Sequence, residues 1–366
     1  MNYNNIKKKI SFCITCMNRC HHLKETLKKN IKDNYSLTDV EFILLDYNSS
    51  DNLEEWIKKE MYDYIRSGIL VYYRTTTPIY YHRSHSRNMA FRLSEGNILC
   101  NLDADNFLGK GFALKMINEF SQNTNIFYTS NLSSNDIFGR VLMLSKDFFA
   151  IRGYNEALEG YGFEDVDLYM RLLNKGLKQM IFTNQLYYNY IKHSKMDRIA
   201  NEKFVNNMHS LYISYIDPYT SDILFLYNDY KFEYGSFIDV KENIIQKEIK
   251  SNSIINNFTI ENREILLKGK LISDKWEETE DKIQFNIDRK LFSFTKNSQS
   301  FEADGKIYYI VSDYEFSIDL LLLLSTMRNI YESNGIIKKN RTVNSTGFGR
   351  GIVYKNFDYR NKIILD

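Results

Sequence analysis

Two short acidic stretches of the sequence hold the residue types best suited to chemistry. Asp103 and Asp105 form a D-x-D triplet after the apolar run Ile98–Cys100. A strand that ends in two carboxylates can hold a divalent metal, which in turn can hold a diphosphate. In the second stretch, Gly160–Asp167, a loop of glycine and aromatic residues runs into an acidic cluster, which can supply a base for an incoming hydroxyl. Together the two stretches predict a metal-dependent enzyme that transfers a sugar from a nucleotide.

The elements that must position these residues alternate between strand and helix in the first half of the chain. Strands are predicted at 10–17, 40–46, 69–74 and 97–102, and helices at 20–32, 53–66 and 84–94. This order predicts an α/β fold, a parallel sheet covered by helices on both faces, with ligands at the carboxyl ends of the strands. Asp46 and Asp103 both lie at such ends, which favours a functional role over solvated turns.

The alternation of predicted strands and helices becomes less regular after residue 140, and the sequence pattern changes again near residue 226. The first part is completed by strands at 141–145 and 177–182 and by helices at 146–151, 165–175 and 201–216. Because Pro218 marks a plausible end, we predict a catalytic domain at 1–225 and a smaller accessory domain at 226–366. The accessory domain is predicted to be mostly β, of α+β class, with alternating strands in 250–312, a leucine-rich helix at 317–332 and a flexible turn at 347–351.

Composition excludes several other classes of protein. The chain has 366 residues, 43% of them hydrophobic and 26% charged, as in an ordinary globular protein. A net charge of +2 gives no polybasic surface for nucleic acid. Met1–Lys9 is not followed by the apolar stretch of a signal peptide, and the densest apolar run, Leu320–Leu324, is too short to span a membrane. We therefore expect a cytoplasmic protein, with attachment to the inner face of the membrane left open.

Three cysteines near the N-terminus raise the alternative of a zinc site. Cys13, Cys16 and Cys20 are followed by two histidines, His21 and His22. The first two cysteines lie on a predicted strand, however, and residues three apart on a strand point to opposite faces. Cys13 and Cys16 would then not share one metal, so buried free thiols are the preferred interpretation, as in a reducing compartment.

Longer motifs around the acidic residues resemble those of known glycosyltransferases. Residues 85–105 contain a stretch that resembles the ARNxG…AxGxxIxxLDAD of family 2-type glycosyltransferases, and residues 40–51 resemble their nucleotide-reading strand. Gly160–Asp167 is similar to the catalytic G-W-G-G-E-D-D-D of β1,4-galactosyltransferases, and Ile191–Lys195 to their I-R-H-S-R. The resemblance covers about residues 8–216 and implies a GT-A fold, which is a Rossmann-like fold that binds nucleotide sugars.

The resemblance implies a role for each matching residue on the donor side. Asp46 would contact the uracil or the ribose, and Arg87 would lie near the nucleotide. Asp103 would lie near the ribose and the metal, while Asp105 and His193 would ligate Mn²⁺, with Mg²⁺ as the other candidate. A carboxylate oxygen combined with an imidazole nitrogen suits Mn²⁺ better than Ca²⁺.

On the acceptor side, the resemblance makes Asp165 the base that takes the proton from the acceptor hydroxyl as this hydroxyl attacks the anomeric carbon and inverts it. Glu164 would raise the pKa of Asp165 by like-charge repulsion. Tyr161 would stack on a sugar face, and Asp167 would contact the acceptor. The implied reaction moves a hexose or N-acetylhexosamine from a UDP-sugar to a hydroxyl of a glycan or glycolipid, in bacterial capsule or lipopolysaccharide synthesis.

Three positions depart from the family patterns. Tyr47–Asn48 stands where the families have D-G, which leaves base recognition less defined. Val166 replaces an aspartate that helps galactosyltransferases to hold their acceptor, which predicts a different acceptor. Tyr190 replaces a methionine ligand, so the metal shell would consist of Asp105, His193 and diphosphate oxygens.

Other interpretations stay open at this point. Asp165 and Asp167 lie where a helix begins and could cap it, and His193 could be a surface residue. A retaining GT-A enzyme, similar to the polypeptide N-acetylgalactosaminyltransferases, would not depend on Asp165 as a base. A non-catalytic protein would bind a nucleotide or a glycan without turnover. The accessory domain could bind the acceptor, dock on a partner or a membrane surface, or form a homo-oligomer.

Overall fold

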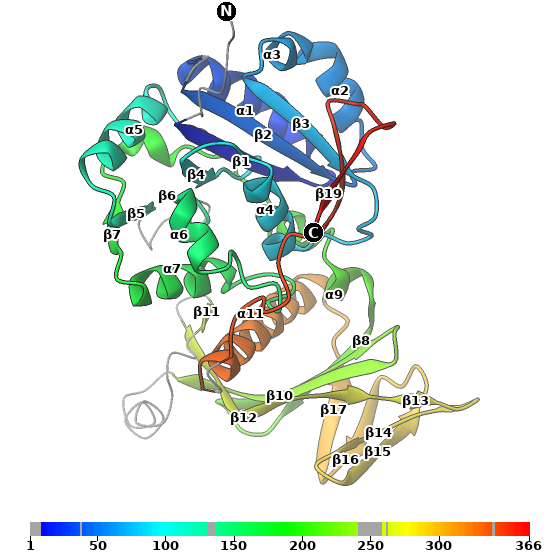
Figure 1. Ribbon diagram of the computed structural model, residues 1–366. Coiled ribbons are helices and arrows are strands. Elements are labelled where there is room, and N and C mark those ends of the chain that lie inside the picture. The colour runs from blue at the N-terminus through cyan, green and yellow to red at the C-terminus, as the bar shows by residue number, and fades with distance from the viewer. Residues whose placement is uncertain (1–8, 37–38, 131–136, 241–257, 261–262, 339–340) are drawn as a thin grey trace, which may run out of the picture. The chain divides into compact units, whose positions relative to one another are not determined.

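The computed structural model describes residues 9–36, 39–130, 137–240, 258–260, 263–338 and 341–366 (Figure 1). The chain forms two compact units. The first consists of residues 1–159, 164–194 and 342–366, and the second of residues 160–163 and 195–341. This division differs from the predicted boundary at residue 225. A hairpin that begins before that boundary belongs to the sheet of the second unit, and the end of the chain returns to the first.

A nine-stranded sheet forms the centre of the first unit, with the strand order β19-β18-β3-β2-β1-β4-β6-β5-β7. Its strands are β1 (Ile10–Cys16), β2 (Val40–Tyr47), β3 (Leu70–Thr75), β4 (Ile98–Asn101), β5 (Ile126–Thr129), β6 (Val141–Leu144), β7 (Lys178–Ile181), β18 (Gly351–Lys355) and β19 (Lys362–Leu365). Strands β3, β2, β1 and β4 are parallel, which confirms the predicted α/β fold. The sheet becomes mixed at β6, which is antiparallel to β4 and β5.

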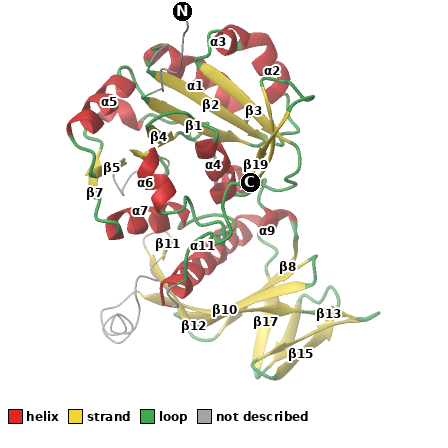
Figure 2. Ribbon diagram, viewed as in Figure 1, coloured by secondary structure: helices red, strands yellow, loops and turns green. Residues whose placement is uncertain are grey.

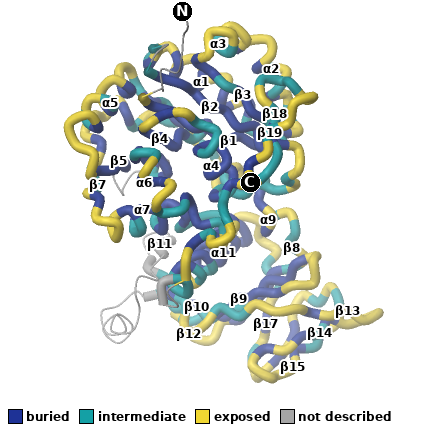
Figure 3. The backbone as a smooth tube through the Cα atoms, in the orientation of Figure 1, coloured by how far each residue is buried: buried dark blue, intermediate teal, exposed yellow. Residues whose placement is uncertain are grey.

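Helices cover both faces of this sheet. They are α1 (Cys20–Asp33), α2 (Leu53–Glu60), α3 (Tyr62–Arg66), α4 (Arg83–Arg92), α5 (Phe112–Gln122), α6 (Ser145–Ala150) and α7 (Glu164–Asn174), with a 3₁₀ turn η1 (Gln185–Tyr188). The helix predicted at 53–66 is two helices, α2 and α3, which meet at the buried Met61. Figure 3 shows the central strands as the buried part of the unit.

The cysteines confirm the strand interpretation of the N-terminal segment. Cys13 and Cys16 belong to two different hydrophobic clusters, as expected for residues on opposite faces of a strand. Cys13, Cys16, Cys20 and Cys100 are all buried free thiols. The predicted burial of these thiols, with Cys13 and Cys16 on opposite faces of the strand, is therefore confirmed.

The second unit contains two antiparallel sheets and a long helix (Figure 2). The larger sheet has the order β11-β12-β10-β9-β8-β17-β16 and the smaller one the order β13-β14-β15. Their strands are β8 (Met208–Tyr215), β9 (Thr220–Tyr227), β10 (Lys231–Val240), β11 (Phe258–Ile260), β12 (Arg263–Lys275), β13 (Glu277–Glu278), β14 (Lys282–Ile287), β15 (Lys290–Thr295), β16 (Ser300–Ala303) and β17 (Lys306–Ile310). The helices of this unit are α8 (Lys195–Ile199), α9 (Lys203–Asn206) and α11 (Tyr314–Lys338).

The single helix predicted at 201–216 is wrong, because the second half of this segment is strand β8 and only Lys203–Asn206 is helical. Leu211 and Ile213 pack in one hydrophobic cluster and Tyr212 in another, so both faces of the strand are covered. A strand buried on both faces lacks the alternation of apolar and polar residues that identifies a strand in sequence. The alternating strands predicted in 250–312 are confirmed from residue 263 onward, whereas residues 250–257 lie outside the described part.

The leucine-rich segment forms α11, which is longer at both ends than predicted. Its leucines pack in a hydrophobic cluster with side chains of β8 and β9 and therefore belong to the core of the second unit. Within the described ranges, no helix is long and apolar enough to cross a membrane.

The segment predicted as a flexible turn, residues 347–351, is instead anchored to α4. Arg92 donates a hydrogen bond from Nη1 to the carbonyl of Phe348 at 2.7 Å, and the N–H of Gly349 donates to Glu156 Oε1 at 2.6 Å. Gly349 has φ +58°, and a Cβ there would lie 2.8 Å from the backbone of α4. A side chain would therefore prevent this close approach, after which the chain adds β18 to the edge of the sheet beside β3.

Candidate active site

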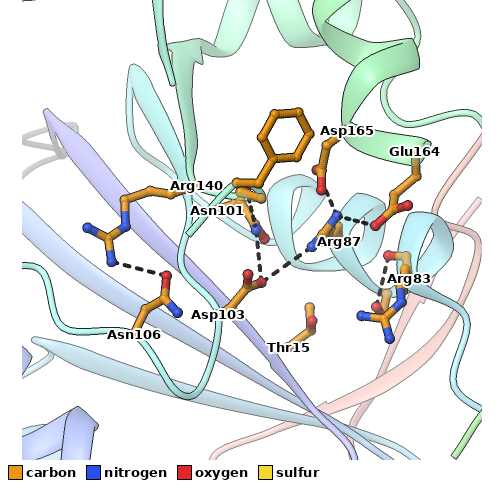
Figure 4. Close-up of polar contacts among 12 residues, drawn as sticks. Thr15, Arg83, Arg87, Asn101, Asp103, Asn106, Arg140, Glu164 and Asp165 are labelled. Carbon is orange, nitrogen blue, oxygen red and sulfur yellow. Dashed lines mark hydrogen bonds and ion pairs between the residues drawn. The ribbon is translucent and has the colours of Figure 1, made fainter. Parts of the chain in front are cut away.

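Arg87 lies at the centre of a buried cluster of three carboxylates (Figure 4). From α4, its Nη1 contacts Asp165 Oδ1 at 2.9 Å and Glu164 Oε1 at 3.3 Å, and its Nη2 contacts Asp103 Oδ1 at 3.3 Å. The Arg87 side chain is 4% exposed. The structure thus brings together Asp103, from the loop after β4, and Glu164 and Asp165, from the first turn of α7.

Asp165 and Glu164 are buried, whereas the side chain of Asp103 is 31% exposed, and all three carboxylates share the guanidinium of Arg87. Burial raises the pKa of Asp165 to about 7, against the positive charge of Arg87 and with a further contribution from Glu164. Glu164 was predicted to be the cause of this shift, but burial is the larger one. For Asp103, burial acts in the same upward direction, but the charge of Arg87 and the amide of Asn101 hold its pKa below the ordinary value.

Gly139 lies directly against this cluster. A Cβ at this position would lie 3.0 Å from Arg87 Nη2, 3.0 Å from Asp103 Oδ2 and 3.2 Å from Asp165 Oδ2, so a side chain here would crowd all three groups. The carbonyl of Gly139 accepts a hydrogen bond of 2.9 Å from Asn101 Nδ2, which also donates to Asp103 Oδ1 at 3.1 Å. Gly139 and Asn101 were not assigned roles from the sequence, although Gly139 lies in a segment that resembles the galactosyltransferases.

Asp105 and His193 form a second, separate pair. Asp105 Oδ2 lies 3.0 Å from His193 Nε2, and each side chain is 8% exposed. His193 Nδ1 lies 3.2 Å from the carbonyl oxygen of Ser194, which can only accept, so Nδ1 carries a proton. In a neutral ring, the lone pair of Nε2 then faces the carboxylate, and a cation bound by both groups would stabilise this arrangement.

This pair fits a divalent cation, although the predicted set of three protein ligands is not assembled. Two ligand atoms at about 2.1 Å from one ion and at right angles are about 3.0 Å apart, the separation found for Asp105 and His193. Asp103 is turned to Arg87 instead, and the described part of the chain contains no group of three or more histidine, cysteine, aspartate or glutamate side chains arranged to hold a metal. Diphosphate oxygens and water would complete the shell.

The backbone around Asp105 and His193 is paired like two short strands. The N–H of Ile191 donates to the carbonyl of Asp105 at 2.8 Å, and the N–H of Phe107 donates to the carbonyl of Asn189 at 2.9 Å. From α1, Thr26 Oγ1 donates to the carbonyl of Ala104 at 2.6 Å. These contacts between distant segments place His193 opposite Asp105, which rules out the alternative of a freely exposed surface histidine.

Asp46, predicted to contact the nucleotide, has no exposed surface. Its carboxylate accepts hydrogen bonds of 2.7 Å from the N–H of Ser49 and from Tyr72 Oη, and it lies 3.5 Å from Arg74 Nη1. Burial raises its pKa. In this structure Asp46 therefore stabilises the turn that follows β2, and it has no oxygen open to a ligand.

Tyr161 and Asp167, the predicted acceptor residues, lie in different surroundings from the Arg87 cluster. Tyr161 belongs to the second unit, where its N–H donates to Ser325 Oγ at 2.8 Å and its Oη accepts from Arg198 at 3.0 Å. Asp167 is buried and pairs with Arg171 one turn further along α7, at 2.7 Å. This ion pair gives Asp167 a structural role.

Comparison with known proteins finds one family model and several solved structures that are similar to part of the chain. The profile of the family described as Glycosyl transferase family 2 matches residues 11–177. Among solved structures, S. aureus TarS 1-349 is similar at 14% identity with a TM-score of 0.43, over 52% of this chain and 61% of that one. The mannosyltransferase PcManGT from Pyrobaculum calidifontis, in complex with GDP-Man and Mn²⁺, is similar at 14% identity with a TM-score of 0.42, over 49% of this chain and 55% of that one.

A mutant of Drosophila β1,4-galactosyltransferase 7, in complex with manganese, UDP-Gal and xylobiose, is similar at 12% identity with a TM-score of 0.37. That match covers 54% of this chain and 76% of the galactosyltransferase. The chain thus spans about three fifths of the TarS fragment, 61% of its length. No curated protein matches the sequence.

Proposed function

We propose that this chain, whose residues 11–177 match the family model described as Glycosyl transferase family 2, moves a hexose or N-acetylhexosamine from a UDP-sugar to a hydroxyl group of a glycan acceptor, with inversion at the anomeric carbon. The observation that supports this best is the environment of Asp165. Burial gives this carboxylate a pKa of about 7, within the range in which a general base is effective at physiological pH. The proposal extends to an acceptor used in bacterial capsule or lipopolysaccharide synthesis.

In the proposed reaction, Asp165 accepts the proton of the acceptor hydroxyl while the oxygen of that hydroxyl forms a bond to the anomeric carbon. The bond between this carbon and the diphosphate oxygen breaks, and its electron pair leaves with UDP. Attack on the face opposite the leaving group inverts the anomeric centre. The proton would go to Asp165 Oδ2, because Oδ1 is held by Arg87 and the absence of a side chain at Gly139 avoids a contact of 3.2 Å with Oδ2.

The other members of the cluster prepare Asp165 for this step. Arg87 opposes the effect of burial on the pKa of Asp165, and its hydrogen bond fixes the orientation of the carboxylate. Glu164 shares the same guanidinium, and among the described residues its buried Oε2 has no hydrogen-bond partner. That oxygen is available to a hydroxyl group of the acceptor.

Asp105 and His193 would hold the cation, Mn²⁺ or Mg²⁺, which when bound would neutralise the charge that develops on the departing diphosphate. The mixture of one carboxylate oxygen and one imidazole nitrogen favours Mn²⁺. The two side chains would present a fixed pair of metal ligands, because the segments that carry them are hydrogen-bonded to each other, from the N–H of Ile191 to the carbonyl of Asp105.

The test is the release of UDP from a panel of UDP-sugars, with and without Mn²⁺, in the wild type and in Asp165→Asn. We expect metal-dependent release with one or two donors and a loss of transfer of at least about 100-fold in the variant, with nucleotide binding retained. Normal transfer by Asp165→Asn would show that the mechanism is wrong. An NMR assignment of the product as retained would favour the retaining alternative, and UDP binding without any turnover would favour a non-catalytic protein.

A further inference from the structure

Arg140, the residue before β6, is a fully buried cation without an acidic hydrogen-bond partner among its described contacts. Its Nη2 donates to Asn106 Oδ1 at 3.1 Å and to the carbonyl of Phe107 at 3.0 Å, and its Nη1 donates to the carbonyl of Tyr187 (Figure 4). Within the described part of the chain, Nε has no partner. Burial is the largest effect on this guanidinium and lowers its pKa, although Asp103 and Asp105 attract the charge from a distance, and its direct hydrogen bonds go only to neutral oxygens. Because burial of such a charge is costly, stability alone does not account for an arginine here.

The three oxygens that Arg140 contacts lie on the two segments that carry Asp105 and His193. Asn106 and Phe107 directly follow Asp105, and Tyr187 lies six residues before His193. These segments pair through the backbone hydrogen bonds at Asp105 and Phe107 and through a bridge between Asn106 and Tyr190. Arg140 therefore ties the two segments together beside the Asp105–His193 pair.

We propose that Arg140 is a positioning residue that holds Asp105 and His193 in register for a divalent cation; this inference rests on the metal site of the proposed function. An arginine suits the task because its planar guanidinium presents several donors in a fixed geometry, whereas lysine presents one mobile ammonium group. Residues that orient metal ligands without touching the metal typically change metal affinity 10- to 100-fold when they are replaced.

A second role for Arg140, repulsion of the bound cation, would have the opposite effect on the affinity for the cation. Asp103 and Asp105 both attract the charge of Arg140, so this charge would repel a cation bound at Asp105. If repulsion were the main effect, removal of the arginine would strengthen cation binding instead of weakening it. The sign of the change in affinity therefore decides between the two roles.

The experiment measures the affinity for Mn²⁺ in the presence of UDP, from the EPR signal of free Mn²⁺, at a temperature where each variant is folded. We expect Arg140→Met and Arg140→Lys to bind Mn²⁺ at least about tenfold more weakly than the wild type. Arg171→Met is the matched control, because Arg171 also bridges a loop, through the carbonyls of Ile151 and Gly153, and is not in the Asp105 segment. Its affinity for Mn²⁺ should equal that of the wild type.

Equal or tighter binding by Arg140→Met would overturn the inference, and so would an equal loss in Arg171→Met, which would point to a general loss of stability. If Arg140→Met does not fold, Asn106→Ala removes only one acceptor of Arg140 and should still weaken Mn²⁺ binding several-fold; unchanged affinity would again overturn the inference. Failure of the wild type to bind Mn²⁺ would instead contradict the metal site itself, and the inference with it.

Discussion

Asp103 and Asp105 are separated by one residue, yet they lie in different electrostatic environments. Asp103 is one of three carboxylates around Arg87, whereas Asp105 faces His193. The chain turns between them: the N–H of Asn106 donates to the carbonyl of Asp103 at 3.0 Å, so the alternation of an extended strand does not apply. The two aspartates of one D-x-D triplet thus contact different partners.

The two environments differ in where their positive charge comes from. The Arg87 cluster carries its own cation, which is buried with the carboxylates that it serves. The Asp105–His193 pair has a carboxylate and an imidazole in contact and is supported from behind by Arg140 through neutral oxygens. We therefore expect the first environment to respond to the loss of an internal residue and the second to respond to the concentration of metal.

The largest effect should follow removal of the internal cation. Arg87→Met leaves the buried Asp165 and Glu164 and the partly exposed Asp103 without the cation that contacts them, and breaking a buried ion pair from one side typically costs about 3–5 kcal/mol. Urea unfolding should show this loss at pH 8 and a smaller loss at pH 5, because Asp165, with a pKa of about 7, is protonated and uncharged at pH 5. Sugar transfer should be abolished at either pH.

Arg171→Met serves as the control, since it removes a partner from one carboxylate, Asp167, and should be less destabilising. A variant Arg87→Met as stable as the wild type at pH 8 would show that the cluster is not held by this charge. Such a stable variant would also contradict the proposal that Arg87 fixes the orientation of the Asp165 carboxylate.

The second largest effect is on the affinity for Mn²⁺, and it should differ between variants of Asp105 and Asp103. Asp105→Asn should lower the affinity for Mn²⁺ in the presence of UDP by about tenfold or more, because it removes a charged ligand of the proposed site. Asp103→Asn, two residues away, should leave this affinity within about twofold of the wild type, since Asp103 is bound to Arg87 and Asn101. Titration with Mn²⁺ checks both variants, and an equal loss in the two would restore the three-ligand site predicted from the sequence.

The local sequence pattern was sufficient to predict the parallel strands that carry the residues of the candidate site. The apolar runs at 40–46 and 97–102 identified buried parallel strands, and the residues at their carboxyl ends were recognised as a group. The long-range contacts were not visible in the sequence. Asp46 is buried and hydrogen-bonded to Ser49 and Tyr72. Strand β8 has no alternation of apolar and polar residues, and β18 pairs with β3 although it lies near the other end of the chain. Each depends on partners that no local pattern specifies.

The smallest predicted effect is on the pH dependence of kcat/KM. It distinguishes Asp103 from Asp105 by the effect of their charges on Asp165. With a pKa of about 7, Asp165 is mostly protonated at pH 6 and mostly ionised at pH 8, so kcat/KM should be about tenfold lower at pH 6 than at pH 8. The negative charge of Asp103 raises the pKa of Asp165, so Asp103→Asn should shift the acidic limb of the profile to lower pH. Asp105→Asn should leave the position of that limb unchanged at saturating Mn²⁺, because Asp105 is not among the charges that act on Asp165 most strongly. A profile that moves in Asp105→Asn and stays in place in Asp103→Asn would reverse the assignment of the two residues.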